Sequence, residues 1–212
     1  FMWSMFRLLV PIGSTWSGAS GNGFACQRNE VVQQMLNDNP DAQWLWFIDD
    51  DHPFDGDILM RLLDRNVDII QPLISTRKPP YRPYAYKADP QNQRGYLTLK
   101  WSEIPTQGII QVEACGCGGM LIRRQVIDEI GTPWFEEGKI ISDTLAEDLF
   151  FCRKAIDKGF KCWVDVDNNI GHLTNCAVWP SQFEGRHVIE LDMHHGVRVR
   201  VQPNIGMPKE EV

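Results

Sequence analysis

The sequence predicts an α/β fold in which helices flank a mostly parallel central sheet. Short apolar runs alternate with segments whose apolar residues recur at helical spacing. This alternation is typical of strands joined by short helical crossovers. The chain has 212 residues, which is enough to bury a sizeable core within one domain. We therefore expect a single domain over residues 1–212.

The first 75 residues carry the clearest alternation of strands and helices. Apolar runs indicate buried strands, and apolar residues three or four positions apart indicate helices with one buried face. Residues 13–23 are rich in Gly and Ser and predict a long loop. The predicted elements, in order, are a strand at Phe6–Ile12, a helix at Phe24–Leu36, a strand at Trp44–Ile48, a helix at Ile58–Leu63 and a strand at Val67–Leu73.

The rest of the chain is less regular. Residues 76–100 contain four prolines and no sustained apolar period, so we expect a loop with a ragged hairpin there. Gly159 predicts the end of a helix. The predicted elements are strands at Ile109–Ala114 and Met120–Ile122, helices at Arg123–Ile130 and Leu145–Ile156, and further strands within Lys161–Val166 and Arg186–Val201.

Composition and charge exclude several classes of protein. Apolar residues make up 43% of the chain and there are eight tryptophans, which argues against a disordered chain, a collagen-like repeat and a coiled coil. No apolar run approaches the roughly 20 residues of a membrane span, so we expect no membrane partner. The net charge of −7 argues against a wholesale nucleic-acid coat, but it leaves room for a local basic patch.

The six cysteines are scattered through apolar segments. They form no CxxC pair, and Cys115-Gly116-Cys117 lacks the spacing of a zinc ribbon. Such cysteines are typical of reduced, packed thiols, so we expect a cytoplasmic protein.

The sharpest chemical signal is the run Asp49-Asp50-Asp51-His52, which directly follows a buried strand. Ligands bind where strands end in open α/β sheets, and alternate residues of an extended segment point the same way. Asp49 and Asp51 are therefore expected to converge on Mg²⁺ or Mn²⁺, which usually bridge to substrate phosphates. The alternative is a solvated acidic turn, which three adjacent carboxylates disfavour because they repel one another unless they are neutralised.

Other nucleotide and cation motifs are absent. An EF-hand loop starting at Asp51 would place Pro53 and Leu62 where carboxylates are needed. Gly18–Gly23 is not followed by the Lys-Ser/Thr of a P-loop, and Gly21-Asn22-Gly23 lacks the third glycine of the dinucleotide fingerprint.

Several short motifs, in this order, resemble those of GT-A glycosyltransferases. The segment Phe47–Phe54 is similar to their DXD element, and Gln27-Arg28-Asn29 is similar to a segment of family-2-type members whose arginine reaches the donor nucleotide. Gly118–Arg124 resembles the glycine turn beneath the sugar, and Glu147-Asp148 resembles the pair that supplies the general base of inverting members. Trp163-Val164-Asp165, followed by Gly171-His172, resembles the late segment whose histidine can bind the metal. The match runs from about Phe6 to about Pro180 and most resembles small phage-encoded glycosyltransferases.

The resemblance implies a GT-A fold, with a nucleotide-binding half at 1–75 and an acceptor-side half with C-terminal strands at 76–212. It implies transfer of a hexose from a nucleotide-diphosphate sugar, with UDP favoured, to a hydroxyl acceptor, in the host cytoplasm if the protein is phage-encoded. The metal, Mn²⁺ or Mg²⁺, is expected on Asp49, Asp51 and His172. The donor is expected on Pro11, Ile12, Gly13, Arg28, Asp49, Asp50, Gly118 and Gly119.

Glycosyl transfer also explains these residue types chemically. The leaving nucleoside diphosphate develops negative charge, which a divalent cation and a cationic side chain such as Arg28 can neutralise. The acceptor hydroxyl needs a base, for which Asp148 is the candidate, with Glu147 beside it. We expect Asp148 at the start of a helix, where the dipole favours the ionised carboxylate. Acidic residues are also common in the first turn of any helix, and in a retaining enzyme Asp148 would not be a base.

The segment 76–100 combines six basic residues, one acid and all four tyrosines. Basic side chains neutralise phosphate and aromatic rings stack on bases, so the acceptor could be DNA carrying hydroxymethylated pyrimidines, reached through this loop. A virion protein is the other acceptor, and an ordinary surface loop is the alternative interpretation. The expected acceptor contacts are Arg77, Lys78, Tyr81, Arg82, Trp134 and Trp179, although such tryptophans are more often part of a core.

Two rival functions remain open at this point. A nucleotidyltransferase could use a similar sheet, but that class usually carries basic residues in its glycine-rich loop and residues 13–23 contain none. A non-catalytic nucleotide- or metal-binding module is the second rival, against which the ordered set from Arg28 to His172 argues.

Overall fold

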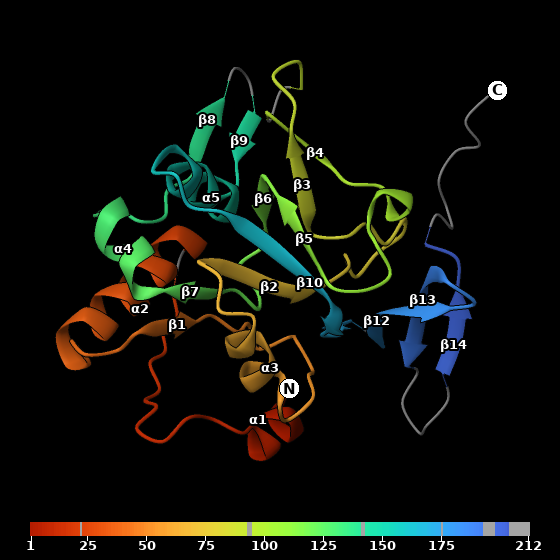
Figure 1. Ribbon diagram of the computed structural model, residues 1–212, viewed down its shortest axis with the longest axis horizontal. Helices are drawn as coiled ribbons and strands as arrows, with labels where there is room; N and C mark the ends of the chain where they lie inside the picture. The colour runs from red at the N-terminus through yellow and green to blue at the C-terminus, as the bar shows by residue number, and fades with distance from the viewer. Residues whose placement is uncertain (22, 93–94, 141–142, 175, 193–197, 204–212) are drawn as a thin grey trace.

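The computed structural model shows a mixed α/β protein built around a five-stranded sheet (Figure 1). It describes residues 1–21, 23–92, 95–140, 143–174, 176–192 and 198–203. The strands of the central sheet, in spatial order, are β1 (Trp44–Trp46), β7 (Leu121–Arg123), β2 (Ile69–Leu73), β10 (Cys162–Asn169) and β5 (Ile109–Val112). None of the helices formed by the described residues is both long enough and apolar enough to cross a membrane.

The prediction of a mostly parallel sheet was wrong. Strands β1, β2 and β10 run in one direction, but β7 lies between β1 and β2 and is antiparallel to both. At the other edge β5 pairs antiparallel with β10, so β10–β2 is the only parallel pairing of the central sheet. Alternating strands and helices early in the chain do produce strands of one direction. A later strand then fills the space between two of them, which local alternation cannot reveal.

Helices cover both faces of the central sheet, as predicted. Helices α2 (Phe24–Asp38), α4 (Arg124–Ile130) and α5 (Glu147–Asp157) pack on one face, and α3 (Ile58–Asp64) packs on the other. Successive strand residues point to opposite faces, so Ile69 joins the first core and Ile70 joins the second. Both residues are fully buried.

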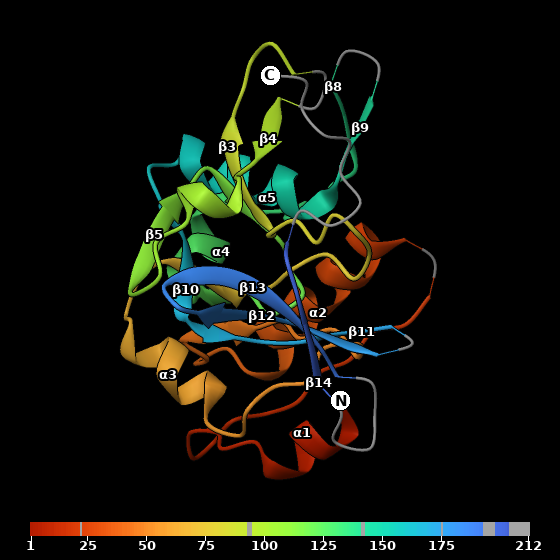
Figure 2. The same cartoon turned by 90° about the vertical axis from the view of Figure 1, so that its right-hand side faces the viewer.

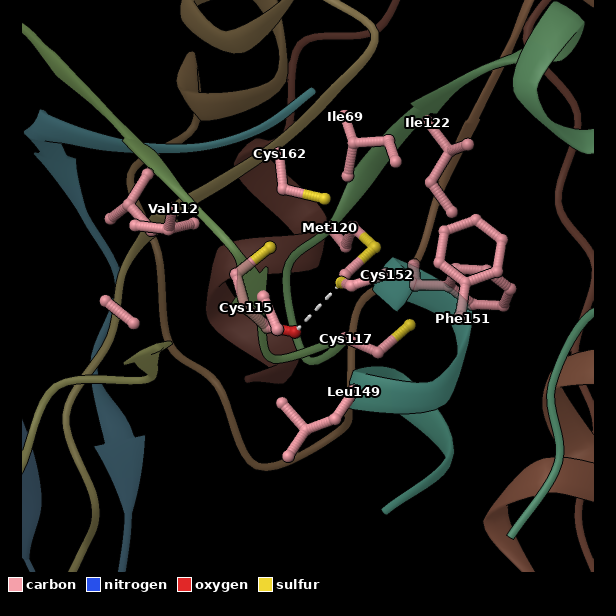
Figure 3. Packing of buried hydrophobic residues seen from close by; sticks show 14 of the residues in the cluster. Ile69, Val112, Cys115, Cys117, Met120, Ile122, Leu149, Phe151, Cys152 and Cys162 are labelled. Carbon is pink, nitrogen blue, oxygen red and sulfur yellow. Dashed lines mark hydrogen bonds between the residues drawn. The ribbon is translucent and has the colours of Figure 1, made fainter. Parts of the chain in front are cut away.

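The larger core gathers four of the six cysteines, together with aliphatic and aromatic side chains (Figure 3). Cys115, Cys117, Cys152 and Cys162 are buried, as the sequence predicted, whereas Cys26 is exposed; none of the six cysteines is disulfide-bonded. The Cys152 thiol donates a weak hydrogen bond to the carbonyl oxygen of Cys115 at 3.6 Å. Packed thiols of this kind act as small apolar side chains.

The predicted strand at Phe6–Ile12 is wrong. The chain instead forms helix α1 (Met2–Arg7) and then continues without helix or strand through residue 21. Phe1, Met5 and Leu8 pack against the core beneath α3, and their spacing is that of one helical face. Ile12, which a buried strand would enclose, is fully exposed.

Residues 76–100 contain the predicted hairpin. Strands β3 (Ala85–Ala88) and β4 (Tyr96–Thr98) are antiparallel, and β6 (Ala114–Cys115) pairs with the other edge of β3. A turn of 3₁₀ helix follows at Trp101–Glu103. Tyr81 and Tyr96 are buried in the core instead of displayed on the surface.

Two antiparallel sheets complete the fold. The sequence did not predict the small hairpin of β8 (Gly138–Ile140) and β9 (Asp143–Leu145) before α5. A four-stranded sheet of β11 (His172–Leu173), β12 (Ala177–Phe183), β13 (Arg186–Asp192) and β14 (Arg198–Val201) closes the C-terminal side (Figure 2). Strands β13 and β14 fall within the predicted segment, whereas β11 and β12 were missed. Strand β11 matters most here because it begins with His172.

Candidate metal centre

The acidic run forms a tight turn just beyond the end of β1. The amide of Asp49 donates to the carbonyl oxygen of Gly118 at 3.1 Å, which ties the turn to the loop before β7. The amide of His52 donates to the carbonyl oxygen of Asp49 at 3.3 Å and closes the turn. Residues 49–52 are therefore not extended, and the alternation expected of a strand does not apply to them.

Backbone hydrogen bonds join this turn to the segment around β11. The amide of Leu173 donates to the carbonyl oxygen of Asp51 at 2.7 Å, and the amide of Gly171 donates to that of Pro53 at 2.8 Å. His172 lies between Gly171 and Leu173 in the chain, so these two hydrogen bonds place its ring beside the acidic turn. This arrangement brings together residues that are far apart in sequence.

Three side chains meet where the turn contacts this segment: Asp51, His52 and His172. We call these three residues the metal cluster, after the ion that they could hold. The Nε2 atom of His172 lies 3.3 Å from one carboxylate oxygen of Asp51 (Oδ2), and the Nε2 atom of His52 lies 3.7 Å from the other (Oδ1). Two ligands bound to one ion at about 2.1 Å are about 3.0–3.4 Å apart for octahedral or tetrahedral angles. The potential ligand atoms of all three residues lie within 4.8 Å of one another, so they can hold one metal ion.

Both histidines are oriented by backbone carbonyl groups. Nδ1 of His52 lies 2.7 Å from the carbonyl oxygen of Gly171, and Nδ1 of His172 lies 3.0 Å from that of Ser75. A carbonyl oxygen only accepts, so each Nδ1 carries the hydrogen and the Nε2 atom of each ring faces Asp51. Metal-binding histidines commonly have this second contact, which fixes both tautomer and ring orientation.

The electrostatics of the cluster also suit a cation. Burial lowers the pKa of His52, so its ring is neutral near pH 7. The neighbouring His172, together with His52 and Arg77, holds the pKa of Asp51 below its usual range even though part of the carboxylate is buried. A carboxylate that faces the lone pair of a buried neutral imidazole is stabilised when a cation lies between them.

The observed cluster differs from the predicted set of metal ligands by one residue. Asp51 and His172 are brought together as predicted, but Asp49 is turned away and binds Arg28, with 2.7 Å between its Oδ1 and Nη2 of the guanidinium. His52, which the sequence pattern did not indicate as a ligand, takes its place in the cluster. The prediction assumed an extended segment, whereas in a turn the adjacent residues 51 and 52 face the same point.

Arg28 presents unused hydrogen-bonding capacity beside the metal cluster. Its guanidinium stacks on the ring of Phe47 at 5.1 Å and its side chain is only 12% exposed. Burial opposes the charge, but Cys117, Asp49 and Glu147 outweigh this effect and raise the pKa of Arg28 overall. Its Nε–H group is buried and has no partner among the described residues. A buried donor without a partner is costly, so this position fits an anionic ligand.

A cavity of about 1420 Å³ is lined by both Arg28 and the metal cluster. It is large enough for a nucleotide-sized ligand, since ligand pockets typically span roughly 300–1,000 Å³. The predicted donor-site and metal-site residues that line it are Pro11, Ile12, Gly13, Arg28, Asp49, Asp50, Asp51, Gly118 and His172. Gly119 does not line the cavity; a Cβ at this position would lie 2.8 Å from Ile170, which is why a glycine is needed in this packed turn.

Glu147 and Asp148 begin helix α5 and also line the cavity. We expected the helix dipole to keep Asp148 ionised, but burial and the adjacent Glu147 carboxylate raise its pKa to about 7. Burial likewise raises the pKa of Glu147. The dipole acts at the helix end, yet desolvation is the larger effect here. A carboxyl that titrates near neutral pH is suited to exchange protons with a ligand.

Tyr84 is a cavity residue that the sequence did not predict. Its phenol lines the cavity, and its pKa is raised by burial and by the charges of Asp148, Asp51 and Asp49. Its ring lies 6.0 Å from that of His172. Tyr84 therefore interacts electrostatically with both Asp148 and Asp51. No sequence pattern distinguishes Tyr84 from the other three tyrosines of residues 76–100.

The predicted acceptor contacts are scattered. Arg77 lies at the metal cluster and lines the cavity, whereas Lys78 and Arg82 are exposed and do not line it. Trp134 is buried, and its indole donates to the carbonyl oxygen of Ile127 at 2.9 Å. Trp179 packs against Gly171 behind the metal cluster. Neither tryptophan is among the described residues that line the cavity.

Comparisons with known proteins bear on the fold alone. No family model matches the sequence, and no curated protein matches it. Among solved structures, the chain is similar to that in "Crystal Structure of A197 from STIV", with a TM-score of 0.53 and 17% sequence identity. The match covers 84% of this chain and 81% of that chain. This similarity shows a shared α/β architecture.

Proposed function

We propose that this protein is a metal-dependent glycosyltransferase of the GT-A fold that transfers a hexose from a nucleotide-diphosphate sugar to a hydroxyl acceptor. One observation carries the proposal: a cation site, an arginine with a free buried donor and a carboxyl that titrates near pH 7 all line one cavity. A metal-dependent, inverting transfer of a glycosyl group from a diphosphate uses these three elements. The motif resemblance supplies the reaction class.

The donor side of the site consists of Arg28 and the metal cluster. A divalent cation on Asp51, His52 and His172 would supply Lewis-acid neutralisation of the charge that develops on the leaving diphosphate. Arg28, which lines the cavity, binds an anionic oxygen of the donor through its guanidinium. Two imidazoles and one carboxylate favour Mn²⁺ over Mg²⁺, since Mg²⁺ prefers oxygen ligands.

The acceptor side of the site centres on Asp148. In its ionised form this carboxylate accepts the proton of the acceptor hydroxyl as the hydroxyl oxygen attacks the anomeric carbon and the bond from that carbon to the leaving diphosphate breaks. Its pKa of about 7 leaves a substantial ionised fraction near neutral pH and provides more basicity than an ordinary aspartate. Glu147 keeps that pKa high by charge repulsion. These roles apply to an inverting reaction.

UDP remains the favoured nucleotide of the donor, and DNA bases or a virion protein remain the proposed acceptors. The basic hairpin at 76–100 offers charge for a polyanion. Because Tyr81 and Tyr96 are buried, the stacking contribution must come from fewer rings than the sequence suggested.

The proposal is tested first by binding. Isothermal titration with UDP, GDP and ADP, each with and without Mn²⁺, should show a nucleotide that binds tightly only when the cation is present. Asp51→Asn should abolish this dependence on Mn²⁺. Asp64→Asn is the matched control, since Asp64 is an exposed aspartate that neither lines the cavity nor belongs to the cluster.

A second assay tests turnover. Release of the nucleoside diphosphate from a panel of UDP-sugars, followed by mass spectrometry of hydroxymethylcytosine DNA or of a protein acceptor, should show the added hexose. Binding without release or transfer would favour the non-catalytic module. Release of pyrophosphate from a nucleoside triphosphate and a sugar phosphate would favour the nucleotidyltransferase. Absence of any cation-dependent nucleotide binding would contradict the proposal.

A further inference from the structure

Arg77 lies against the metal cluster, where a cation would be expected. Its Nη1 atom is 3.0 Å from Oδ2 of Asp51, the same oxygen that lies 3.3 Å from Nε2 of His172. The Arg77 side chain is 49% exposed, whereas the two histidine side chains are almost fully buried. The guanidinium therefore approaches the cluster from the solvent side. Among the described residues, Asp51 is its one ion-pair partner.

The guanidinium and a metal ion would compete for the same carboxylate oxygen. Of the two oxygens of Asp51, Arg77 holds the one nearer to an imidazole nitrogen. An ion between Asp51 and His172 would bring a second positive charge close to Arg77. Like charges at this distance repel, and the exposed side chain is free to move away because Asp51 is its one ion-pair partner in the described part of the chain.

We propose that Arg77 is an internal counter-cation, which neutralises Asp51 in the metal-free site and is displaced when a divalent cation binds. The displaced guanidinium remains at the wall of the cavity, since Arg77 and Tyr84 both line it. It then becomes available to an anionic ligand, on the solvent side of the metal cluster. Cation binding thereby converts Arg77 from a partner of Asp51 into a binding residue for phosphate.

This inference gives the site an order of binding. The cation binds first and frees Arg77, and the diphosphate group follows and contacts Arg77 together with Arg28. The second step rests on the proposed function, whereas the competition between Arg77 and the cation does not. The two steps predict opposite effects of one substitution, because removal of Arg77 removes both a competitor of the cation and a partner of the anion.

The test is isothermal titration of the full chain with Mn²⁺ alone and then with UDP at saturating Mn²⁺. Arg77→Gln should bind Mn²⁺ about three- to tenfold more tightly than the unmodified chain, because it no longer has to break an ion pair. The same variant should bind UDP about tenfold more weakly in the presence of Mn²⁺. Arg77→Lys, which retains the charge, should return the affinity for Mn²⁺ toward its original value. Lys78→Gln is the matched control, since this adjacent basic residue is exposed and does not line the cavity.

The outcomes separate this inference from the proposed function. Unchanged or weaker Mn²⁺ binding by Arg77→Gln would overturn the competition, and unchanged UDP binding would overturn the role in binding anions. A matching gain in Mn²⁺ affinity by Lys78→Gln would also overturn it, since the effect would then be one of general charge. Normal Mn²⁺ binding with no binding of UDP, GDP or ADP by any variant would contradict the proposed function and leave the competition standing. Absence of Mn²⁺ binding by every variant would overturn both.

Discussion

The ring of His52 and the carbonyl oxygen of Gly171, 119 residues apart in the chain, are joined by a hydrogen bond of 2.7 Å. This bond fixes which nitrogen of His52 carries the hydrogen and aims the other one at Asp51. The amide of Gly171 is anchored in turn to the carbonyl oxygen of Pro53. The orientation of His52 is thus set by the backbone on both sides of the cluster.

His52→Ala should weaken Mn²⁺ binding by about 100-fold or more, since even loss of a residue that only supports a ligand typically costs 10- to 100-fold. The measurement is titration calorimetry with Mn²⁺ in the absence of nucleotide. Asp49→Asn is the comparison, because Asp49 pairs with Arg28 and should leave binding of the cation alone nearly unchanged. If Asp49→Asn were the more damaging of the two, the originally predicted ligand set would be restored.

Gly118→Ala should block the metal site sterically. A Cβ at this position would lie 2.4 Å from Nε2 of His52 and 3.3 Å from a carboxylate oxygen of Asp49, so the ring must move away from Asp51. We expect loss of Mn²⁺ binding with a melting temperature lowered by a few degrees, the latter corresponding to about 1 kcal/mol. Gly18→Ala is the control, since a Cβ there meets nothing within 4 Å. Full Mn²⁺ affinity in Gly118→Ala would show that the cluster is not the cation site.

Asp148→Asn should stabilise the protein increasingly as the pH rises. The folded-state pKa of Asp148 is raised to about 7 from 3.8, so the unmodified chain loses stability as the pH rises between these two values. The amide cannot ionise and escapes this loss, and its oxygen can still accept the hydrogen bond that the amide of Leu149 donates at 2.7 Å. Its advantage in free energy of unfolding should be on the order of 2 kcal/mol larger at pH 8 than at pH 5. Urea titrations at the two pH values measure this difference, and an advantage independent of pH would refute the raised pKa.

The pH dependence of turnover should show the same ionisation. If Asp148 accepts the proton of the acceptor, kcat/KM should rise with pH through an apparent pKa of about 7 and level off above it. Asp148→Asn should abolish transfer while leaving Mn²⁺-dependent UDP binding within about threefold of its original value. A rate that stays flat from pH 5 to pH 9 would assign the proton transfer to another group.

Local sequence pattern predicted most of the helices and strands. Apolar spacing placed α2 and α3 and the helices near residues 124 and 147 close to their observed positions. It failed at Phe6–Ile12, where an apolar run was interpreted as a strand although Phe1, Met5 and Leu8 share a helical face. Local pattern could not predict the strand order, because β7 pairs with β1 and β2, which lie far from it in the sequence.

The candidate site shows the same division between local and distant information. The resemblance singled out Asp51 and His172, and the structure brings them within 3.3 Å. It missed His52 because the choice between Asp49 and His52 depends on whether the segment is extended or turned. That geometry is fixed by hydrogen bonds to Gly118 and Leu173, which no local pattern contains. The role of Trp134 was likewise decided by burial, which the sequence alone did not specify.

The hydrogen bonds between the 49–53 turn and the 171–173 segment also bear on how the protein matures. During synthesis the central strands β1, β2 and β7 are complete long before His172 emerges from the ribosome. Until then the nascent chain carries Asp51 and His52 without their third partner and without the carbonyl group that orients His52. The complete cluster of Asp51, His52 and His172 therefore forms late, and a chain released before residue 171 would lack it.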